Sequence, residues 1–292
     1  MKKVKIVCNW DNDVNIMNRV ISNYQIGDSN DDFIFTSKND YDYLICLNKT
    51  NHTPLVPKEK VFTFIMEPSW SPNWDRNCFN YSGKVFCHDK KLFGGHPNIE
   101  ESPSFMFYHM DYKKTTLKQI LIEKNEHKKR ISMVVSFTPN GGYNYSKRTQ
   151  LALSILDNDL PVDIYGNGWD FINHPNVKGS IGDKLEGVKD YSFSIAIENS
   201  CEKNYLTEKF FDVTLCGGVP IYYGCPNVSD IYGNYIPIDL DNIPETIQTI
   251  KDVIYTNKYD HMLNDKTDIT KYAENHNLIK KIKELINYEK TI

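Results

Sequence analysis

Residues 191–224 read YSFSIAIENSCEKNYLTEKFFDVTLCGGVPIYYG, and this stretch decides the fold class. Two apolar runs, 193–197 and 219–223, have the length and composition of buried β-strands, and the segment between them predicts a helix over 208–216. A strand, a helix and a second strand in this order indicate a parallel sheet. Because parallel sheets bind ligands at the carboxyl ends of their strands, we expect the functional residues in the loops that follow strands.

The same alternation extends toward both ends of the chain. Further strand-like runs lie at 4–8, 33–35, 43–47, 61–65, 85–87, 131–137 and 162–165. One helical stretch lies at 147–156. Residues 124–130 are charged and do not favour burial. A chain of 292 residues also has the length at which single cores tend to divide. We therefore predict two α/β domains, residues 1–127 and 128–292, the second ending in an amphipathic helix.

The composition is that of an ordinary globular protein. The net charge of -4, from 34 Lys plus Arg and 38 Asp plus Glu, gives no reason to expect a phosphate-rich partner over the whole surface. No apolar run is long enough to span a membrane, and the apolar N-terminal run is too short for a signal peptide. The seven cysteines lack the short, even spacing of a secreted disulfide framework. These features indicate a cytoplasmic protein.

The loop after the strand at 193–197 and the helix that follows it hold the residues with the clearest chemical meaning. The carboxyl end of that strand carries three polar residues, Glu198, Asn199 and Ser200. Thr207 is a typical N-cap, which places Glu208 and Lys209 in the first helical turn. A lysine there opposes the helix dipole by up to about 1 kcal/mol unless a negative group binds beside it. A bound phosphate is such a group.

A second candidate phosphate loop is NGGYNYSKR at 140–148. Gly141 and Gly142 follow a predicted strand and precede a helix, so the backbone at this point can approach a phosphate closely. Lys147 or Arg148 then supplies positive charge to the same group.

The stretch 191–224 resembles the signature of glycosyltransferase family 10, the α1,3-fucosyltransferases. In that signature an apolar strand and ENS precede a YVTEK motif, a helix and a strand that begins with G-V-P. The matching residues here are Glu198, Asn199, Ser200, Tyr205, Thr207, Glu208, Lys209, Gly218, Val219, Pro220 and Gly224, with Leu206 where valine or isoleucine is usual. Close resemblance extends over residues 131–233, and the first domain matches only in general pattern.

This resemblance implies a GT-B fold, with two Rossmann-like domains facing a central cleft and a C-terminal helix that packs across the domains. It implies a GDP-fucose donor in the second domain and a glycan acceptor in the first. Arg148 would bind the pyrophosphate, Glu208 the ribose and Lys209 a phosphate, while Asn199 and Tyr205 complete the donor site. The implied reaction is an inverting transfer of fucose to a hydroxyl group, without a metal ion or cofactor.

Such a transfer needs a general base for the acceptor hydroxyl. In the resembling family the base is proposed to be a glutamate near the end of a first-domain strand, and Glu67 in VFTFIMEPSWSPNW is the matching candidate. Trp70 and Trp74 follow it, and they either offer flat faces to an acceptor sugar or pack in the core. His88 and His109 follow other apolar runs and are reserve candidates for acid–base chemistry.

Several alternatives stay open at this point. Four acidic DxD triplets, which begin at Asp11, Asp40, Asp157 and Asp239, would suit a Mn²⁺-dependent transferase but are expected by chance in an Asp-rich chain. One alternative is a glycosyltransferase of the same fold that uses another nucleotide sugar, or a non-glycan acceptor such as a modified nucleic-acid base. A third hypothesis is a non-catalytic module that binds nucleotide sugars or glycans. The expected location is the cytoplasm of a bacterium or of a virus-infected cell.

Overall fold

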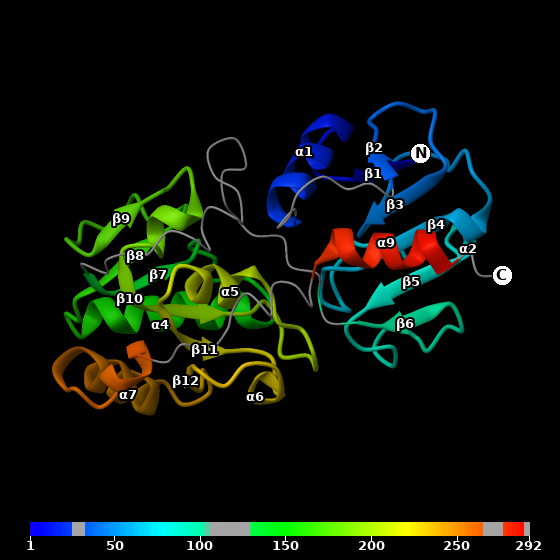
Figure 1. The fold of residues 1–292 in the computed structure, drawn as a ribbon. Helices are drawn as coiled ribbons and strands as arrows, with labels where there is room; N and C mark the ends of the chain where they lie inside the picture. The colour runs from blue at the N-terminus through cyan, green and yellow to red at the C-terminus, as the bar shows by residue number, and fades with distance from the viewer. Residues whose placement is uncertain (25–32, 103, 105–128, 265–276, 289–292) are drawn as a thin grey trace.

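The computed structural model describes residues 1–24, 33–102, 104, 129–264 and 277–288, and it shows two α/β domains side by side (Figure 1). The elements of the first are β1 (Lys2–Cys8), α1 (Asp13–Tyr24), β2 (Phe33–Phe35), β3 (Tyr43–Leu47), η1 (Lys58–Lys60), β4 (Val61–Phe64), α2 (Cys78–Tyr81), β5 (Lys84–Cys87) and β6 (Ile99–Glu101). Those of the second are β7 (Lys129–Val134), α4 (Asn144–Asp157), β8 (Val162–Tyr165), β9 (Val177–Gly179), η2 (Lys184–Gly187), β10 (Tyr191–Ile197), α5 (Glu208–Leu215), β11 (Val219–Tyr223), α6 (Val228–Ile231), β12 (Ile236–Pro237), α7 (Ile243–Tyr255) and η3 (Asp260–Asn264). One further helix, α9 (Leu278–Tyr288), follows them.

Each domain is built on a six-stranded sheet. The strand order is β2-β1-β3-β4-β5-β6 in the first sheet and β12-β11-β10-β7-β8-β9 in the second. Every strand pairing in both sheets is parallel. The predicted GT-B type of α/β fold is therefore confirmed, and within each sheet the carboxyl ends of all strands meet at one edge.

The central strands are buried on both sides, as expected for parallel strands that are covered by helices on both faces. All five residues of β3 are buried, and so are the last five of β1. One buried residue of β1 is charged: Lys5 is 2% exposed, and its Nζ lies 2.8 Å from Asp13 at the start of α1. This ion pair lets a cation occupy the core, because a buried charge needs a partner.

The sequence located the buried strands better than the edge strands. The strand predicted at 131–137 ends at Val134, although Phe137 still donates its N–H to Asn167 beyond β8. The short edge strands β6, β9 and β12, together with the helix α7, were not among the predicted elements. An edge strand of two or three residues has too few side chains to show a period of two.

The C-terminal helix α9 packs on the first domain although it follows the second in sequence (Figure 1, red). Its apolar face, formed by Leu278, Ile279, Ile282, Leu285 and Ile286, belongs to the core cluster that contains the strands of the first sheet. This confirms the predicted helix that crosses between the domains. The predicted division at 127/128 lies outside the described residues and stays a prediction. The C-terminal helix, which the prediction placed in the second domain, packs in the core of the first domain.

Because α9 closes this core, Ile282→Ala is expected to destabilise the first domain by about 2–5 kcal/mol, the range for truncating a fully buried isoleucine. Chemical denaturation of the whole chain measures the change. Lys280→Ala, on the exposed side of the same helix, is the matched control and should stay within about 0.5 kcal/mol. Equal effects of the two substitutions would show that α9 does not contribute to the core.

Within the part of the chain that the structure describes, no helix has the length and apolar character that crossing a membrane requires.

Candidate functional site

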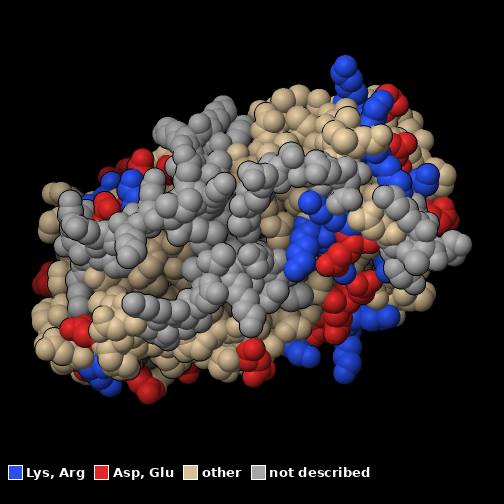
Figure 2. All heavy atoms as spheres, viewed as in Figure 1, with Lys and Arg blue, Asp and Glu red and all other residues tan. Residues whose placement is uncertain are grey.

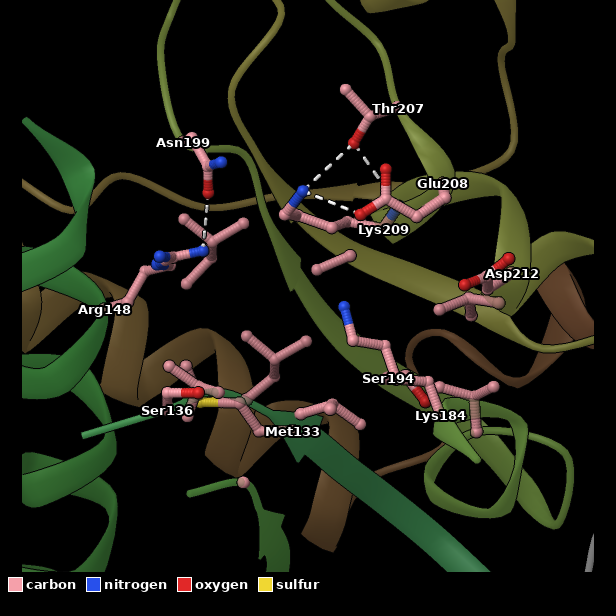
Figure 3. Close-up of a pocket in the computed structure, with 18 of the residues that line it drawn as sticks. Met133, Ser136, Arg148, Lys184, Ser194, Asn199, Thr207, Glu208, Lys209 and Asp212 are labelled. Atoms are coloured by element: carbon pink, nitrogen blue, oxygen red, sulfur yellow. Dashed lines mark hydrogen bonds and ion pairs between the residues drawn. The ribbon is translucent and has the colours of Figure 1, made fainter. Parts of the chain in front are cut away.

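A cavity of about 560 Å³ lies between the two domains. The second domain supplies most of its lining, from the carboxyl ends of β7 and β10 and from the first turns of α5, as expected for a parallel sheet. The first domain contributes Trp10, Arg19, Asn48, Met66, Glu67 and Ser104. Figure 3 shows the polar residues of the second domain around this cavity.

The start of α5 is fixed by a buried carboxylate. Thr207 caps the helix and accepts a hydrogen bond from the Lys209 N–H, while Glu198 accepts bonds from both the N–H (2.8 Å) and the hydroxyl (2.6 Å) of Thr207. Glu198 is fully buried, and burial raises its pKa. Glu198 therefore fixes the position of the N-cap of α5 and does not line the cavity.

Two residues of the predicted signature, Glu208 and Lys209, lie in the first turn of α5 and line the cavity. Lys209 Nζ is 2.9 Å from Glu208 Oε1 and 3.8 Å from Glu198. Burial alone lowers the Lys209 pKa, but Glu208 and Glu198 outweigh it and raise the pKa. The sequence predicted that a negative group must offset this cation at the helix start. The structure supplies two carboxylates of the protein itself for that purpose.

Arg148 reaches the cavity from α4 (Figure 3). Its Nη1 donates to Asn199 Oδ1 at 2.9 Å, and its guanidinium lies over the Tyr145 ring, 4.4 Å from the centroid. Burial lowers the Arg148 pKa, and the nearest acidic groups only partly compensate. Its Nε is buried without a hydrogen-bond partner among the residues described. Among the residues that the structure describes, Arg148 therefore faces the cavity with a neutral amide, and no carboxylate, as its direct partner.

Tyr205 and Glu67 complete the predicted set in the cavity lining. Tyr205 is 2% exposed, and burial, followed by the charges of Glu198, Glu208 and Glu67, raises its pKa well above the usual value. Its phenol therefore stays protonated at neutral pH. Glu67 follows β4 in the first domain, and its Oε2 accepts a hydrogen bond from Ser71 Oγ at 2.9 Å. The cavity thus presents a carboxylate of one domain to cations of the other.

A hydrogen-bond network centred on Glu202 joins the domains beside the cavity. Glu202 accepts from the Ser69 N–H (3.0 Å) and from Ser200 Oγ (2.8 Å), and it is 2.7 Å from His88 Nε2. Burial by itself raises the Glu202 pKa, but these bonds outweigh it and lower the pKa. His88, a reserve acid–base candidate, is therefore a fully buried contact between the domains. Ser200 belongs to the same hydrogen-bond network, which forms the seam between the domains. The other reserve residue, His109, lies outside the described residues.

The two tryptophans predicted for the acceptor differ in their surroundings. Trp70 donates to Ser200 Oγ at 3.2 Å and stacks on the ring of Tyr143, with centroids 3.9 Å apart, so one of its faces is covered. Trp74 is 6% exposed, with Arg76 3.5 Å above its ring. Trp74 packs in the core, the second reading left open by the sequence, because its faces are not accessible to a sugar.

In the other predicted phosphate loop, 140–148, Arg148 lines the cavity, whereas Gly141, Gly142 and Lys147 do not. Lys147 projects to the surface, where it pairs with Asp241. At Gly141 a Cβ would lie 2.5 Å from Tyr145 Cβ, whereas Gly142 has open space around it. The glycine that the cavity does require is Gly166: its φ is +142°, and a Cβ would lie 2.0 Å from the Val135 carbonyl oxygen. Gly166 lets the ends of β7 and β8 approach closely.

Sequence analysis missed several lining residues. Those with charged or hydrogen-bonding side chains in the second domain are Ser136, Thr138, Tyr145, Asn167, Lys184, Ser194, Thr207 and Asp212, of which Thr207 was expected only as a helix cap. Lys184 begins a short 3-10 turn in GDKLEG, where nothing in the local pattern separates it from a surface lysine. Its position shows only in the folded sheet.

No three histidine, cysteine, aspartate or glutamate side chains gather into a metal-ion site within the described ranges of the chain. The paired aspartates of the DxD triplets therefore find no third ligand there.

The second domain is similar to known proteins. Residues 125–262 match the family model described as glycosyltransferase family 10 (fucosyltransferase) C-term, so the resemblance predicted from the signature is confirmed. A putative fucosyltransferase-like protein of Arabidopsis thaliana is 35% identical over 34% of this chain and 18% of its own length. Alpha-(1,3)-fucosyltransferase B of Drosophila melanogaster is 30% identical over 32% of this chain and 23% of its own. The chain thus matches about a fifth of the length of these relatives.

Solved structures of an α1,3-fucosyltransferase share the fold of the whole chain. One aligns with a TM-score of 0.58 at 18% identity and covers 98% of this chain and 90% of that one. Another, with GDP-fucose, aligns with a TM-score of 0.55 at 19% identity and covers 90% and 81%. At these identities the likeness establishes the fold.

Proposed function

We propose that this protein is a glycosyltransferase that transfers fucose from GDP-fucose to a hydroxyl group of a glycan, with inversion and without a metal ion. One observation carries the proposal: Arg148, Asn199, Tyr205, Glu208 and Lys209 of the second domain and Glu67 of the first line one cavity. The sequence alone predicts all six as site residues. The match of the second domain to family 10, and the shared fold of an α1,3-fucosyltransferase with GDP-fucose, support the choice of donor.

The arrangement supports a single displacement. Glu67 takes the proton of the acceptor hydroxyl, the hydroxyl oxygen bonds to C1 of fucose, and the bond from C1 to the diphosphate oxygen breaks with its electrons leaving on GDP. Arg148 and Lys209 stabilise the charge that develops on the diphosphate, since both are cations that line the cavity. Glu208 binds the ribose hydroxyls when a phosphate takes its place beside Lys209.

The charge distribution favours a neutral glycan over a nucleic acid as the acceptor. On the face drawn in Figure 2, basic side chains lie beside acidic ones, and Lys84 and Lys281 both pair with Glu100 at 3.0 and 3.3 Å. Such mixed charge gives little of the attraction that a phosphate backbone requires.

Thermal unfolding with GDP, UDP, ADP, CMP and their sugar conjugates tests the donor. A ligand at 100 times its dissociation constant adds about 2.7 kcal/mol to stability, and each kcal/mol moves the midpoint of a protein of this size by about 2–4 °C. We expect a shift of about 5–10 °C with GDP and GDP-fucose only. A shift with UDP instead would indicate that the donor is a UDP-sugar and not GDP-fucose. Binding of GDP-fucose without any glycosyl product would indicate a non-catalytic module.

Metal independence is tested by assaying the transfer in EDTA. We expect the rate to stay within about twofold, because Arg148 and Lys209 take the place of a metal at the diphosphate. Complete loss of transfer in EDTA, restored by Mn²⁺, would contradict the proposed mechanism.

A further inference from the structure

Lys184 is a cation in the cavity that no predicted role accounts for. It begins η2, and its side chain lines the same cavity as Arg148 and Lys209 (Figure 3). The turn that carries it is firmly placed: Asp183 caps it by accepting from the Leu185 N–H at 3.0 Å. A Cβ at Gly187 would lie only 2.6 Å from Val134 Cγ2, so η2 packs directly on the end of β7.

The charge of Lys184 is not neutralised by a direct partner. Among the described residues, no hydrogen bond or ion pair reaches its ammonium group, whereas Lys209 lies 2.9 Å from Glu208 Oε1. Burial lowers the Lys184 pKa, with Glu208 and Asp212 acting against it and Lys209 and Arg148 adding to it. Lys184 is half-buried, and an ammonium group in a cavity without a carboxylate partner can receive an anion.

We propose that Lys184 binds the diphosphate of the donor nucleotide as a third cation, together with Arg148 and Lys209. This inference rests on the function proposed above. The three side chains approach one cavity from three separate elements, η2, α4 and α5, and in Figure 3 they surround the same space. Among the parts of a nucleotide sugar, only the diphosphate carries enough negative charge to pair with several cations at once.

Titration calorimetry with GDP and with guanosine tests this contact in the whole chain of 292 residues. Lys184→Gln is expected to weaken GDP binding by about 10- to 100-fold, as for the loss of one charge-assisted hydrogen bond, and to leave guanosine binding unchanged. Lys184→Arg should retain most of the GDP affinity because it keeps the charge. Lys189→Gln, an exposed lysine that follows the same turn, is the matched control and should bind GDP as the parent does.

The stability of the ligand-free protein separates a binding role from a structural one. Because Lys184→Gln removes a desolvated charge, its melting temperature should equal or exceed that of the parent while its GDP affinity falls. A lower melting temperature with unchanged GDP affinity would overturn the proposal. Equal weakening of GDP and guanosine would also overturn it, since Lys184 would then contact the base.

The same experiment distinguishes failure of the inference from failure of the proposed function. If the parent protein binds GDP and Arg148→Ala abolishes this binding but Lys184→Gln does not, only the inference is wrong. If the parent binds no guanine nucleotide, the proposed function fails and the inference fails with it.

Discussion

Glu67→Gln is expected to lower kcat by about 10²- to 10⁴-fold, the contribution of a general base to a transfer of this kind. The substitution keeps the shape of the side chain and its hydrogen bond from Ser71, which is 2.9 Å long, but removes the group that accepts the proton. Glu67 belongs to the first domain, whereas the predicted donor contacts belong to the second. The affinity for GDP should therefore change by less than about twofold, because a general base acts on the acceptor in the transition state and does not contribute to GDP binding.

Steady-state kinetics and calorimetry on the same samples check this expectation. Glu59→Gln, an exposed carboxylate on η1, is the control and should behave as the parent in both measurements. A Glu67→Gln variant with full kcat would remove Glu67 from the mechanism. Glu198 and Glu202 are poor replacements as the general base, because the oxygens of both carboxylates already accept structural hydrogen bonds.

Arg148→Ala is expected to lower kcat/KM by about 10²- to 10³-fold, as for the loss of one preorganised donor to a developing charge. The guanidinium is already held in place by Asn199 at 2.9 Å and by the ring of Tyr145. The Arg148 side chain therefore loses little conformational entropy when it binds a diphosphate. Arg148→Lys should recover only part of the loss, because an ammonium group lacks the planar fork of donors.

Lys147→Ala gives the sharpest comparison, since it removes the same charge one residue away. Lys147 pairs with Asp241 at the surface, and we expect its loss to change kcat/KM by less than about twofold. Comparable losses for Lys147→Ala and Arg148→Ala would mean that charge near α4 matters and the directed contact does not. Melting curves of both variants show whether either substitution has disturbed the fold.

Much of the second domain was predictable because its signals are local. Thr207 as the cap of α5 and the buried strands β10 and β11 each depend on a few neighbouring residues, and all three were predicted correctly. The donor-site candidates were also found, because a family signature records residues that stay close in sequence. The roles of these residues stay predictions until the experiments above are made.

At the candidate site, the errors and omissions concern contacts between segments that are distant in sequence. The sequence did not separate Lys147 from Arg148, yet neighbouring residues on a helix point in directions about 100° apart, and only Arg148 faces the cavity. It did not show that Trp74 is buried, or that Ser200 joins Trp70 and Glu202 in the seam between the domains. Lys184 is separated from Lys209 by a whole strand and a loop.

The sequence by itself determined the alternation of strands and helices and the family signature, because both depend on short-range order along the chain. Only the tertiary structure decided which of several similar side chains face the cavity, and that α9 returns to complete the core of the first domain. The physical reason is that burial and charge pairing depend on distances in space. Sheet topology sets those distances, and it brings Glu67 to the same cavity as Arg148, Lys184 and Lys209.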